Sequence, residues 1–436
     1  MGNAVVRVNG HEYDHDGVLA EGGFASVIRV RRGGAPYALK WTRGIGDDAQ
    51  LQRVLLEIQV QRKLQHPNTM RLVEAEVRVT GASRGGGGGA SPAKNRNHAP
   101  RKEVLMVFPL YPRGTLQQHL EIAAQQRITA FSEAECLRLF TPLVEAVLEL
   151  HARGFAHRDL KPHNILLTSS EPMEPVLTDF GSLAPVKTQI VSAHDALELF
   201  EDAAQFCSAP YRAPELWESH SSTGLRGEVN NGKCDVWSLG CVLYAMAFGP
   251  YSPFESGTEG VLRLAIFSGN VRFPPDKSQF GTTFSRAFVD FILWMLTVAP
   301  DERPTIYQVL DRVDDLRAGR AVGARGGSRR SLSLRRSLSK KVISQKSGLD
   351  DWADFSAFND LVNDLNDQET KSSASAHSST VSRSSWQVVS GRPSLADSLA
   401  SPQSIARVSS LRGHDMDQRR TLSLRGRQLL ASALTS

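Results

Sequence analysis

The chain has 436 residues, more than one compact domain of ordinary size needs, so two cooperating parts and an appendage are expected. Its four cysteines form no CxxC metal-binding pairs, no secretory signal opens the sequence, and no apolar run approaches the roughly 18 residues of a membrane helix. These features exclude a membrane-spanning chain and indicate reduced thiols in a cytoplasmic protein.

The net charge of +5 is unevenly distributed along the chain. Nine Lys and Arg residues and no acid lie between Arg320 and Lys346, and subtracting those nine charges from +5 leaves −4 for the rest. The predicted folded part is therefore not basic, and we expect no nucleic-acid partner.

The first third of the chain predicts strands and one helix. Short β-rich runs surround the glycines from Val18 to Lys40, and an amphipathic stretch from Leu51 to Leu64 has near-helical spacing. Residues 81–102 are glycine-rich and polar, and they separate the apolar runs Met70–Val79 and Val104–Leu110. They are predicted to be a flexible insertion in a strand-to-strand loop.

Helical patterns dominate the next part. Ser132 is a predicted N-cap with Glu135 three residues later, and the helical pattern that follows runs to His151. Further helical patterns follow Asp235 and Phe284. The chain beyond residue 110 is therefore expected to be mainly helical up to about residue 318.

Two features early in the chain are typical of a phosphate site. The run AEGGFASV, from Ala20 to Val27, resembles a glycine-rich loop whose backbone N–H groups approach phosphates. Thirteen residues later, Lys40 is placed to bridge the α- and β-phosphates of ATP, and Glu57 on the following helix would hold its ammonium. Each feature alone has an ordinary alternative, because glycine hairpins and exposed charged residues are common.

The motif HRDLKPHN, His157 to Asn164, followed by Asp179-Phe180-Gly181, makes chance agreement improbable. Asp159 would accept the proton of a substrate hydroxyl, and Lys161 would neutralise the transferred γ-phosphate. Asn164 and Asp179 would hold magnesium through oxygen atoms.

Later motifs predict two structural contacts. Glu215 of an Ala-Pro-Glu motif and the distant Arg303 are expected to form a buried ion pair. Asp235, which opens the run DVWSLG, is expected to accept hydrogen bonds from the backbone of the turn at His157 and Arg158.

With these motifs, residues 8–318 resemble a eukaryotic protein kinase domain. The resemblance implies an α+β, bilobal fold: a small lobe, 8–109, of a β-sheet and one helix, and a large, mainly helical lobe, 110–318. It implies ATP and Mg²⁺ as cofactors. Lys161 and Ser208, the latter three residues before Tyr211, match the serine/threonine pattern, so protein substrates with Ser or Thr hydroxyls are implied.

The same resemblance implies the outline of the ATP site. Phe108 would be the gatekeeper, and Ala20 replaces the first glycine of the loop, which is expected to stiffen the turn. Leu19, Val27, Ala38 and Leu166 would enclose adenine beside the hinge at Pro109, Leu110 and Tyr111. The full implied set is Leu19, Ala20, Glu21, Gly22, Gly23, Phe24, Ala25, Ser26, Val27, Ala38, Lys40, Glu57, Phe108, Pro109, Leu110, Tyr111, Leu166 and Asp179.

Finer motifs, including EGGFASV, YALK, HPN and CSAPYRAPEL, resemble the Numb-associated kinase family, and within it the subfamily of myristoylated and palmitoylated serine/threonine kinases. This implies a link to membrane traffic and a helical insert at Asp195–Phe206 in an activation segment held by packing more than by phosphorylation. The alternative is an ordinary exposed loop helix.

The sequence departs from these relatives near its start. Gly2 follows Met1, but residue 6 is Val rather than Ser or Thr and no cysteine precedes Cys136. Nearby palmitoylation is excluded, and myristoylation of Gly2 stays open. One acyl chain binds only marginally unless a basic patch helps, and the tail supplies such a patch, so weak, reversible contact with endomembranes is the most that is expected.

Residues 319–436 are predicted to be a disordered, basic, serine-rich tail. Three sites, Arg329–Leu332, Arg335–Leu338 and Arg419–Leu422, place a hydroxyl after paired arginines and are either phosphosites or parts of an unmodified tail. The acidic amphipathic segment 350–367 is expected to dock, either on the kinase domain or, through Trp352–Phe358, on an adaptor or trafficking protein.

Two rival functions remain. A pseudokinase scaffold would recruit partners through the tail without transferring phosphate, but the chain retains Lys40, Glu57, Asp159, Asn164 and Asp179. A small-molecule kinase of related fold is disfavoured by the Ala-Pro-Glu platform, which serves peptide substrates. The sequence therefore favours an active protein kinase.

Overall fold

A computed structural model describes residues 4–22, 25–46, 48–80, 101–217, 227–275 and 278–320. The predictions for the tail beyond residue 320, for its acidic segment and for Gly2 lie outside these residues, as do Gly23, Phe24 and residues 81–100 of the predicted insertion. Structural statements below concern the described residues.

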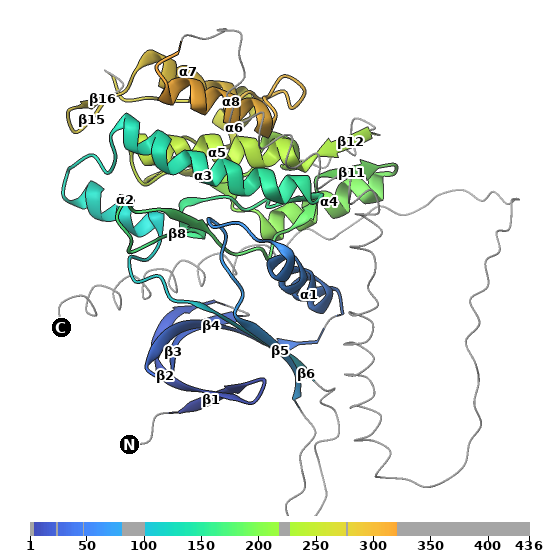
Figure 1. Cartoon of the computed structure of the whole chain (residues 1–436). Coiled ribbons are helices and arrows are strands. Elements are labelled where there is room, and N and C mark those ends of the chain that lie inside the picture. The colour runs from blue at the N-terminus through green and yellow to red at the C-terminus, as the bar shows by residue number, and fades with distance from the viewer. Residues whose placement is uncertain are drawn as a thin grey trace, which may run out of the picture. The chain divides into compact units, whose positions relative to one another are not determined.

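The first part is a six-stranded antiparallel sheet with the order β1-β2-β3-β4-β6-β5 (Figure 1). Consecutive strands pair as hairpins except at β4, which pairs with β6, so that β5 lies at the edge. The strands are β1 (Val5–Val8), β2 (His11–Glu21), β3 (Ala25–Arg32), β4 (Ala35–Ile45), β5 (Glu74–Thr80) and β6 (Arg101–Pro109).

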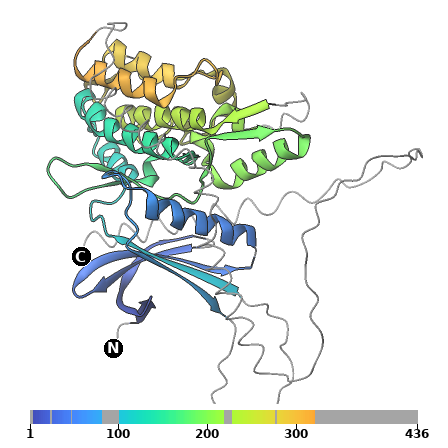
Figure 2. The same cartoon turned by 45° about the vertical axis from the view of Figure 1, so that its right-hand side comes forward.

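Helix α1 (Asp48–Lys63) follows β4 and lies along the sheet in Figures 1 and 2. Successive residues of β6 point to opposite faces of the sheet. Val104 and Met106 therefore join the large core with Leu55 of α1, whereas Leu105 and Val107 belong to a second core on the other face. The large core continues from α1 into the helical part.

The second part is mainly helical, with short strand pairs, as predicted. Its central helices α3 and α5 pack on each other and on α7 and α8. The helices are α2 (Leu116–Gln125), α3 (Glu133–Ala152), α4 (Ala193–Phe206), α5 (Asn231–Phe248), α6 (Arg263–Ser268), α7 (Arg286–Met295) and α8 (Ile306–Arg317). The strands are β7 (Phe155–Ala156), β8 (Ile165–Leu167), β9 (Pro175–Leu177), β10 (Ala184–Pro185), β11 (Lys187–Ile190), β12 (Gly227–Asn230), β13 (Glu255–Ser256), β14 (Gly260–Val261), β15 (Ser278–Gln279) and β16 (Thr282–Thr283), with 3₁₀ turns at Pro162–Asn164, Ala209–Tyr211 and Pro214–Leu216.

Element boundaries agree with the sequence where side chains encode them. The Ser132 hydroxyl accepts from the Glu135 backbone and the Glu135 carboxylate accepts from the Ser132 backbone, so the predicted start of α3 is confirmed. Arg101 and Lys102, expected in the insertion, instead open β6, because they pair with Thr80 and Val79 of β5. Strand pairing thus extends beyond the apolar run.

Other elements begin earlier than predicted. Helix α1 starts at Asp48 rather than Leu51, α4 starts at Ala193 rather than Asp195, and the sheet starts at Val5, whereas the β-rich pattern predicts strands from Val18. Helix α5 starts at Asn231, so Asp235 lies within it. The added residues of α1 and α4 are polar or small and those of the first strand are mostly exposed, so apolar periodicity does not detect them, and the first turn of α5 contains Asn231 and Gly232, which are not typical of a helix interior.

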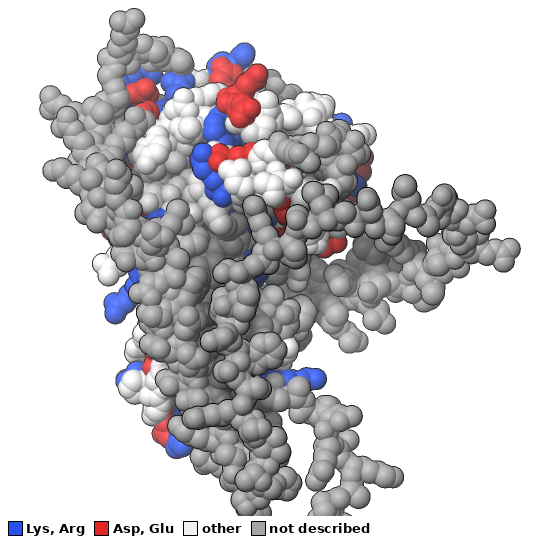
Figure 3. Space-filling view, turned by 90° about the vertical axis from the view of Figure 1, so that its right-hand side faces the viewer, with Lys and Arg blue, Asp and Glu red and all other residues white. Residues whose placement is uncertain are grey.

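Figure 3 shows the side of the molecule that lies on the right of Figure 1, near α4, β11 and β12. Basic and acidic side chains are intermingled on the described surface in this view. One exposed pair, Lys187–Glu228 at 2.7 Å, joins β11 to β12. Among the helices of the described residues, none is both long and apolar enough to cross a membrane.

Candidate active site

The predicted residues Ala20, Val27 and Lys40 form one row across the sheet, and Ala38 lies two residues from Lys40 on the same face. Ala20 pairs with Val27, Val27 pairs with Lys40, and Ala38 pairs with Phe108 on the neighbouring strand. Because directly paired residues point to the same face, the β2–β3 hairpin lies next to the Lys40 side chain.

The tip of this hairpin is tightly packed at Gly22. The Gly22 N–H donates to the Ala25 carbonyl at 2.8 Å, and a Cβ on Gly22 would lie 3.2 Å from that same oxygen. Gly23 and Phe24 complete the tip outside the described residues, while Glu21 and Ser26 pair at its base.

Lys40 contacts two carboxylates from different parts of the fold. Its Nζ donates to Glu57 Oε1 at 2.9 Å and Oε2 at 3.1 Å, and to Asp179 Oδ1 at 3.1 Å. Glu57 lies on α1 with a side chain only 3% exposed, whereas the Asp179 side chain is about half exposed. One ammonium group therefore connects β4, α1 and the segment after β9.

Charge proximity determines how these groups ionise. Burial opposes the charge of Lys40, but the Asp179 and Glu57 carboxylates raise its pKa above the ordinary value. The Lys40 ammonium in turn lowers the pKa of Asp179 to about 2. Both groups are therefore charged at neutral pH.

Asp159 is the centre of a second group of contacts. Lys161 Nζ donates to its Oδ2 at 2.7 Å, Asn164 Nδ2 donates to the same oxygen at 3.0 Å, and the Ser208 N–H donates to Oδ1 at 2.9 Å. Lys161 also donates to the Ser208 hydroxyl at 2.6 Å. Asp159 is thus an oriented, buried carboxylate with a cation beside it.

Asn164 and Asp179 supply oxygen ligands suited to Mg²⁺. Among the described residues, no group of three or more His, Cys, Asp or Glu side chains could hold a metal ion by itself. This donor set fits Mg²⁺, which keeps several waters and is held by one or two protein oxygens together with substrate phosphates. Asp179 lies at φ 63°, a left-handed conformation for a residue with a side chain.

Comparison with known proteins agrees with this geometry. The family model described as Protein kinase domain matches residues 13–313. The chain belongs to the protein kinase family. The resemblance to a eukaryotic protein kinase domain and the predicted α+β bilobal fold are therefore confirmed.

Named relatives extend the comparison. Serine/threonine-protein kinase 16 of Rattus norvegicus is 34% identical over 305 residues, which is 68% of this chain and 88% of the relative. The Homo sapiens protein of the same name is also 34% identical over 305 residues, with the same coverage. A probable serine/threonine-protein kinase of Dictyostelium discoideum is 25% identical over 379 residues, 71% of this chain and 95% of that protein.

Both structural contacts predicted from the sequence, at Asp235 and between Glu215 and Arg303, are present in the kinase. Asp235 Oδ2 accepts from the His157 N–H at 2.8 Å, and Oδ1 accepts from the Arg158 N–H at 2.7 Å. His151 Nε2 lies 2.7 Å from Asp235 Oδ2. These contacts hold the backbone at Arg158, which has φ 66°, directly before Asp159.

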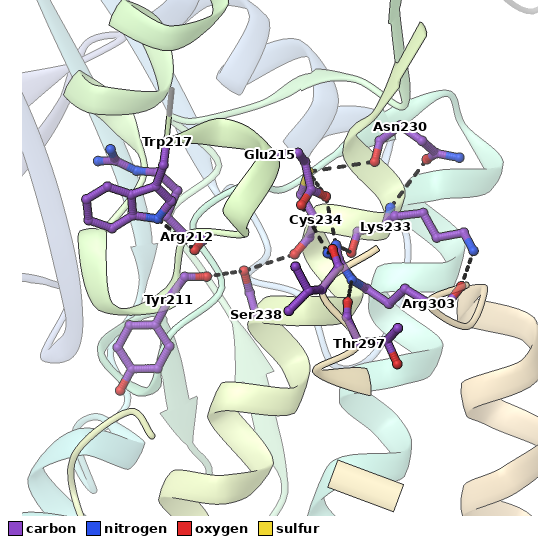
Figure 4. A network of polar contacts seen from close by, with 11 residues as sticks. Tyr211, Arg212, Glu215, Trp217, Asn230, Lys233, Cys234, Ser238, Thr297 and Arg303 are labelled. Carbon is purple, nitrogen blue, oxygen red and sulfur yellow. Dashed lines mark hydrogen bonds and ion pairs between the residues drawn. The ribbon is translucent and has the colours of Figure 1, made fainter. Parts of the chain in front are cut away.

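Figure 4 shows the second contact, between the Ala-Pro-Glu motif and the segment before α8. Arg303 donates to Glu215 Oε1 at 2.7 Å and Oε2 at 3.0 Å, and its side chain is 0% exposed. It also donates to the carbonyls of Thr297, Val298 and Lys233. The guanidinium thus anchors three segments of the kinase together.

The implied adenine site lies where the two parts of the kinase join. Phe108 is buried near the end of β6, and Pro109 ends that strand. Leu110 and Tyr111 lead from it towards α2, and burial raises the pKa of Tyr111. Ala38 and Leu166 are half-buried against the same core, whereas Leu19 is 39% exposed.

The sequence motifs do not predict a role for two residues of this region. Arg53 of α1 and Asp202 of α4 form an ion pair, and Asp202 also pairs with Arg158. The spacing of Arg53 four residues before Glu57 on one helix is the signal that could have identified Arg53. Its partner depends on how α4 docks, which no local pattern encodes.

Proposed function

We propose that this kinase is an active ATP- and Mg²⁺-dependent serine/threonine protein kinase. One observation carries the proposal: the Lys40–Glu57–Asp179 contacts are closed, and Asp159 is oriented by Lys161. Phosphoryl transfer requires mainly positioning and charge neutralisation, and these contacts supply both.

Asp159 and Lys161 are proposed to act on the reacting atoms. The substrate hydroxyl oxygen forms a bond to the γ-phosphorus of ATP while the bond to the β,γ-bridging oxygen breaks, leaving ADP. Asp159 accepts the hydroxyl proton, since its carboxylate retains acceptor capacity beyond the contacts described. Lys161 neutralises charge on the transferred group.

The nucleotide and metal are proposed to bind between the β2–β3 hairpin and the segment after β9. Lys40 would bind the α- and β-phosphates, and Asn164 and Asp179 would hold Mg²⁺. When bound, Mg²⁺ supplies a positive charge that neutralises the phosphates. Lys40, already fixed by Glu57, requires little reorganisation to bind its anion.

Serine and threonine are the proposed acceptors. The relatives that match most of the kinase domain are named as serine/threonine kinases. In this chain Lys161 also contacts the Ser208 hydroxyl in the segment before Tyr211, the arrangement expected from the serine/threonine pattern.

The finer predictions are proposed mainly on sequence motifs. They are membership of the Numb-associated kinase family, a link to membrane traffic, an adaptor partner for Trp352–Phe358, and a cytoplasmic location with weak contact to endomembranes. The motifs EGGFASV and CSAPYRAPEL and the helix α4 support the family proposal.

The experiment uses the full chain with radiolabelled ATP, Mg²⁺ and a generic protein substrate. Wild-type protein is expected to label serine and threonine, and Asp159→Asn is expected to lower labelling about 100- to 10,000-fold. Equal labelling by both proteins, or phosphate found only on tyrosine, would contradict the proposal. If the wild-type protein transfers no label to the substrate, the result would favour the pseudokinase scaffold.

A further inference from the structure

Three elements of the kinase meet at one carboxylate. Asp202 lies on α4, and its Oδ1 accepts from Nη2 of Arg53 on α1 while its Oδ2 accepts from Nη1 of Arg158 in the catalytic loop. Figures 1 and 2 both place α4 close to α1, in agreement with these contacts. Each oxygen of the carboxylate therefore accepts a hydrogen bond from a different part of the kinase.

The Arg158 guanidinium depends on this carboxylate for charge neutralisation. Its side chain is 3% exposed, and its Nε and Nη2 atoms are buried without a hydrogen-bond partner among the described residues. A buried charge without a counter-ion is strongly unfavourable. Asp202 is thus the acid in direct contact with this buried cation.

The contact with α1 has an apolar component as well. The Arg53 guanidinium lies 3.7 Å from the centre of the Phe206 ring. Phe206 follows Asp202 by four residues on α4, so both lie on the same face of that helix. Arg53 is therefore held by an ion pair and by an aromatic ring together.

Both arginines lie next to residues of the active site. Arg53 precedes Glu57 by four residues, so the two share a face of α1, and Glu57 holds Lys40 at 2.9 Å. Arg158 directly precedes Asp159 in the chain. A shift at Asp202 would be transmitted to Glu57 through one rigid helix and to Asp159 through one peptide unit.

We propose that Asp202 is a positioning residue for phosphoryl transfer, which bridges Arg53 and Arg158 and fixes α1 relative to the catalytic loop. This inference rests on the proposed kinase activity.

The test compares steady-state kinetics of the full chain with those of Asp202→Asn, which keeps the side-chain shape and removes the charge. The matched control is Glu201→Gln, an exposed acid one residue earlier on α4. We expect Asp202→Asn to lower kcat about 10- to 100-fold, because displacements near 1 Å have effects of this size. The KM for ATP changes less, Asp202→Glu restores part of kcat, and Glu201→Gln matches wild type.

Further measurements separate positioning from a general loss of structure. All kinetics are measured well below each variant's melting temperature, and the double variant Arg53→Gln, Asp202→Asn is expected to lose little more than the worse single variant, because both act through one contact. Asp202→Asn with kcat within about twofold of wild type would overturn the proposal.

Hydrogen exchange gives a readout that does not require activity. Asp202→Asn is expected to speed amide exchange in α1, residues 48–63, whereas Glu201→Gln does not. If wild-type protein transfers no phosphate, the proposed function fails, and exchange in α1 alone decides whether Asp202 fixes that helix. Unchanged exchange in Asp202→Asn would then refute the bridge itself.

Discussion

Replacing Glu215 by Gln should destabilise the kinase strongly, because it removes the only charge that the structure places against the Arg303 guanidinium in the described residues. Arg303 is 0% exposed on its side chain, and both of its terminal nitrogens donate to Glu215. A Gln amide retains one acceptor oxygen but turns an NH₂ group towards the other guanidinium nitrogen. The cation stays buried among carbonyls with no neutralising charge.

Breaking one partner of a buried ion pair costs about 3–5 kcal/mol. For a domain of about 300 residues, matched over 13–313, an unfolding entropy of about 2.1 cal/mol/K per residue means that each kcal/mol lowers the melting temperature by about 1.6 °C. Glu215→Gln is therefore expected to melt about 5–8 °C lower. Thermal unfolding followed by circular dichroism, with urea unfolding at pH 7, measures both quantities.

The control is Glu228→Gln, which removes the same charge from an exposed pair. Lys187 and Glu228 are 61% and 35% exposed, and such a pair contributes at most about 1 kcal/mol. If Glu215→Gln melts within about 2 °C of Glu228→Gln, the reasoning from burial is wrong.

Two further predictions concern Lys40 and Tyr13 of the small lobe. Lys40→Met leaves the Glu57 and Asp179 carboxylates without their cation, and kcat should fall about 100- to 1,000-fold; a fall no larger than that of the exposed control Lys187→Met would contradict this. Burial raises the pKa of Tyr13 to about 12, above the value near 10 in an unfolded chain, so the stability supplied by its hydrogen bond to Glu74 is complete below pH 10 and is lost as pH rises from 10 to about 12. Tyr13→Phe should therefore lower the free energy of unfolding by about 1–2 kcal/mol at pH 8, and a difference that stays constant in urea melts up to pH 11.5 would contradict the assignment.

The proposed catalytic residues could be predicted from the sequence because their chemistry fixes both residue type and spacing. Asp159, Lys161 and Asn164 lie within one short turn, so their proximity follows from the chain itself. The Lys40–Glu57 contact is distant in sequence, but a strand followed by an amphipathic helix leaves few ways to arrange the two.

The remaining features depend on tertiary contacts. Arg101 and Lys102 look like loop residues, and their place in β6 is set by the neighbouring strand rather than by their own propensity. The bridge from Asp202 to Arg53 requires α4 to dock on α1, and the acid in α4 has no local feature that distinguishes it from Glu201.

The most direct test of the account separates nucleotide binding from phosphoryl transfer in one pair of proteins. Wild-type chain and Asp159→Asn are compared for binding of ATP with Mg²⁺ by calorimetry and for transfer to substrate in a single turnover. The account predicts equal affinity within about threefold and a rate of transfer lower by about 100- to 10,000-fold in the variant. Equal rates of transfer, or failure of the wild-type chain to bind ATP with Mg²⁺, would contradict it.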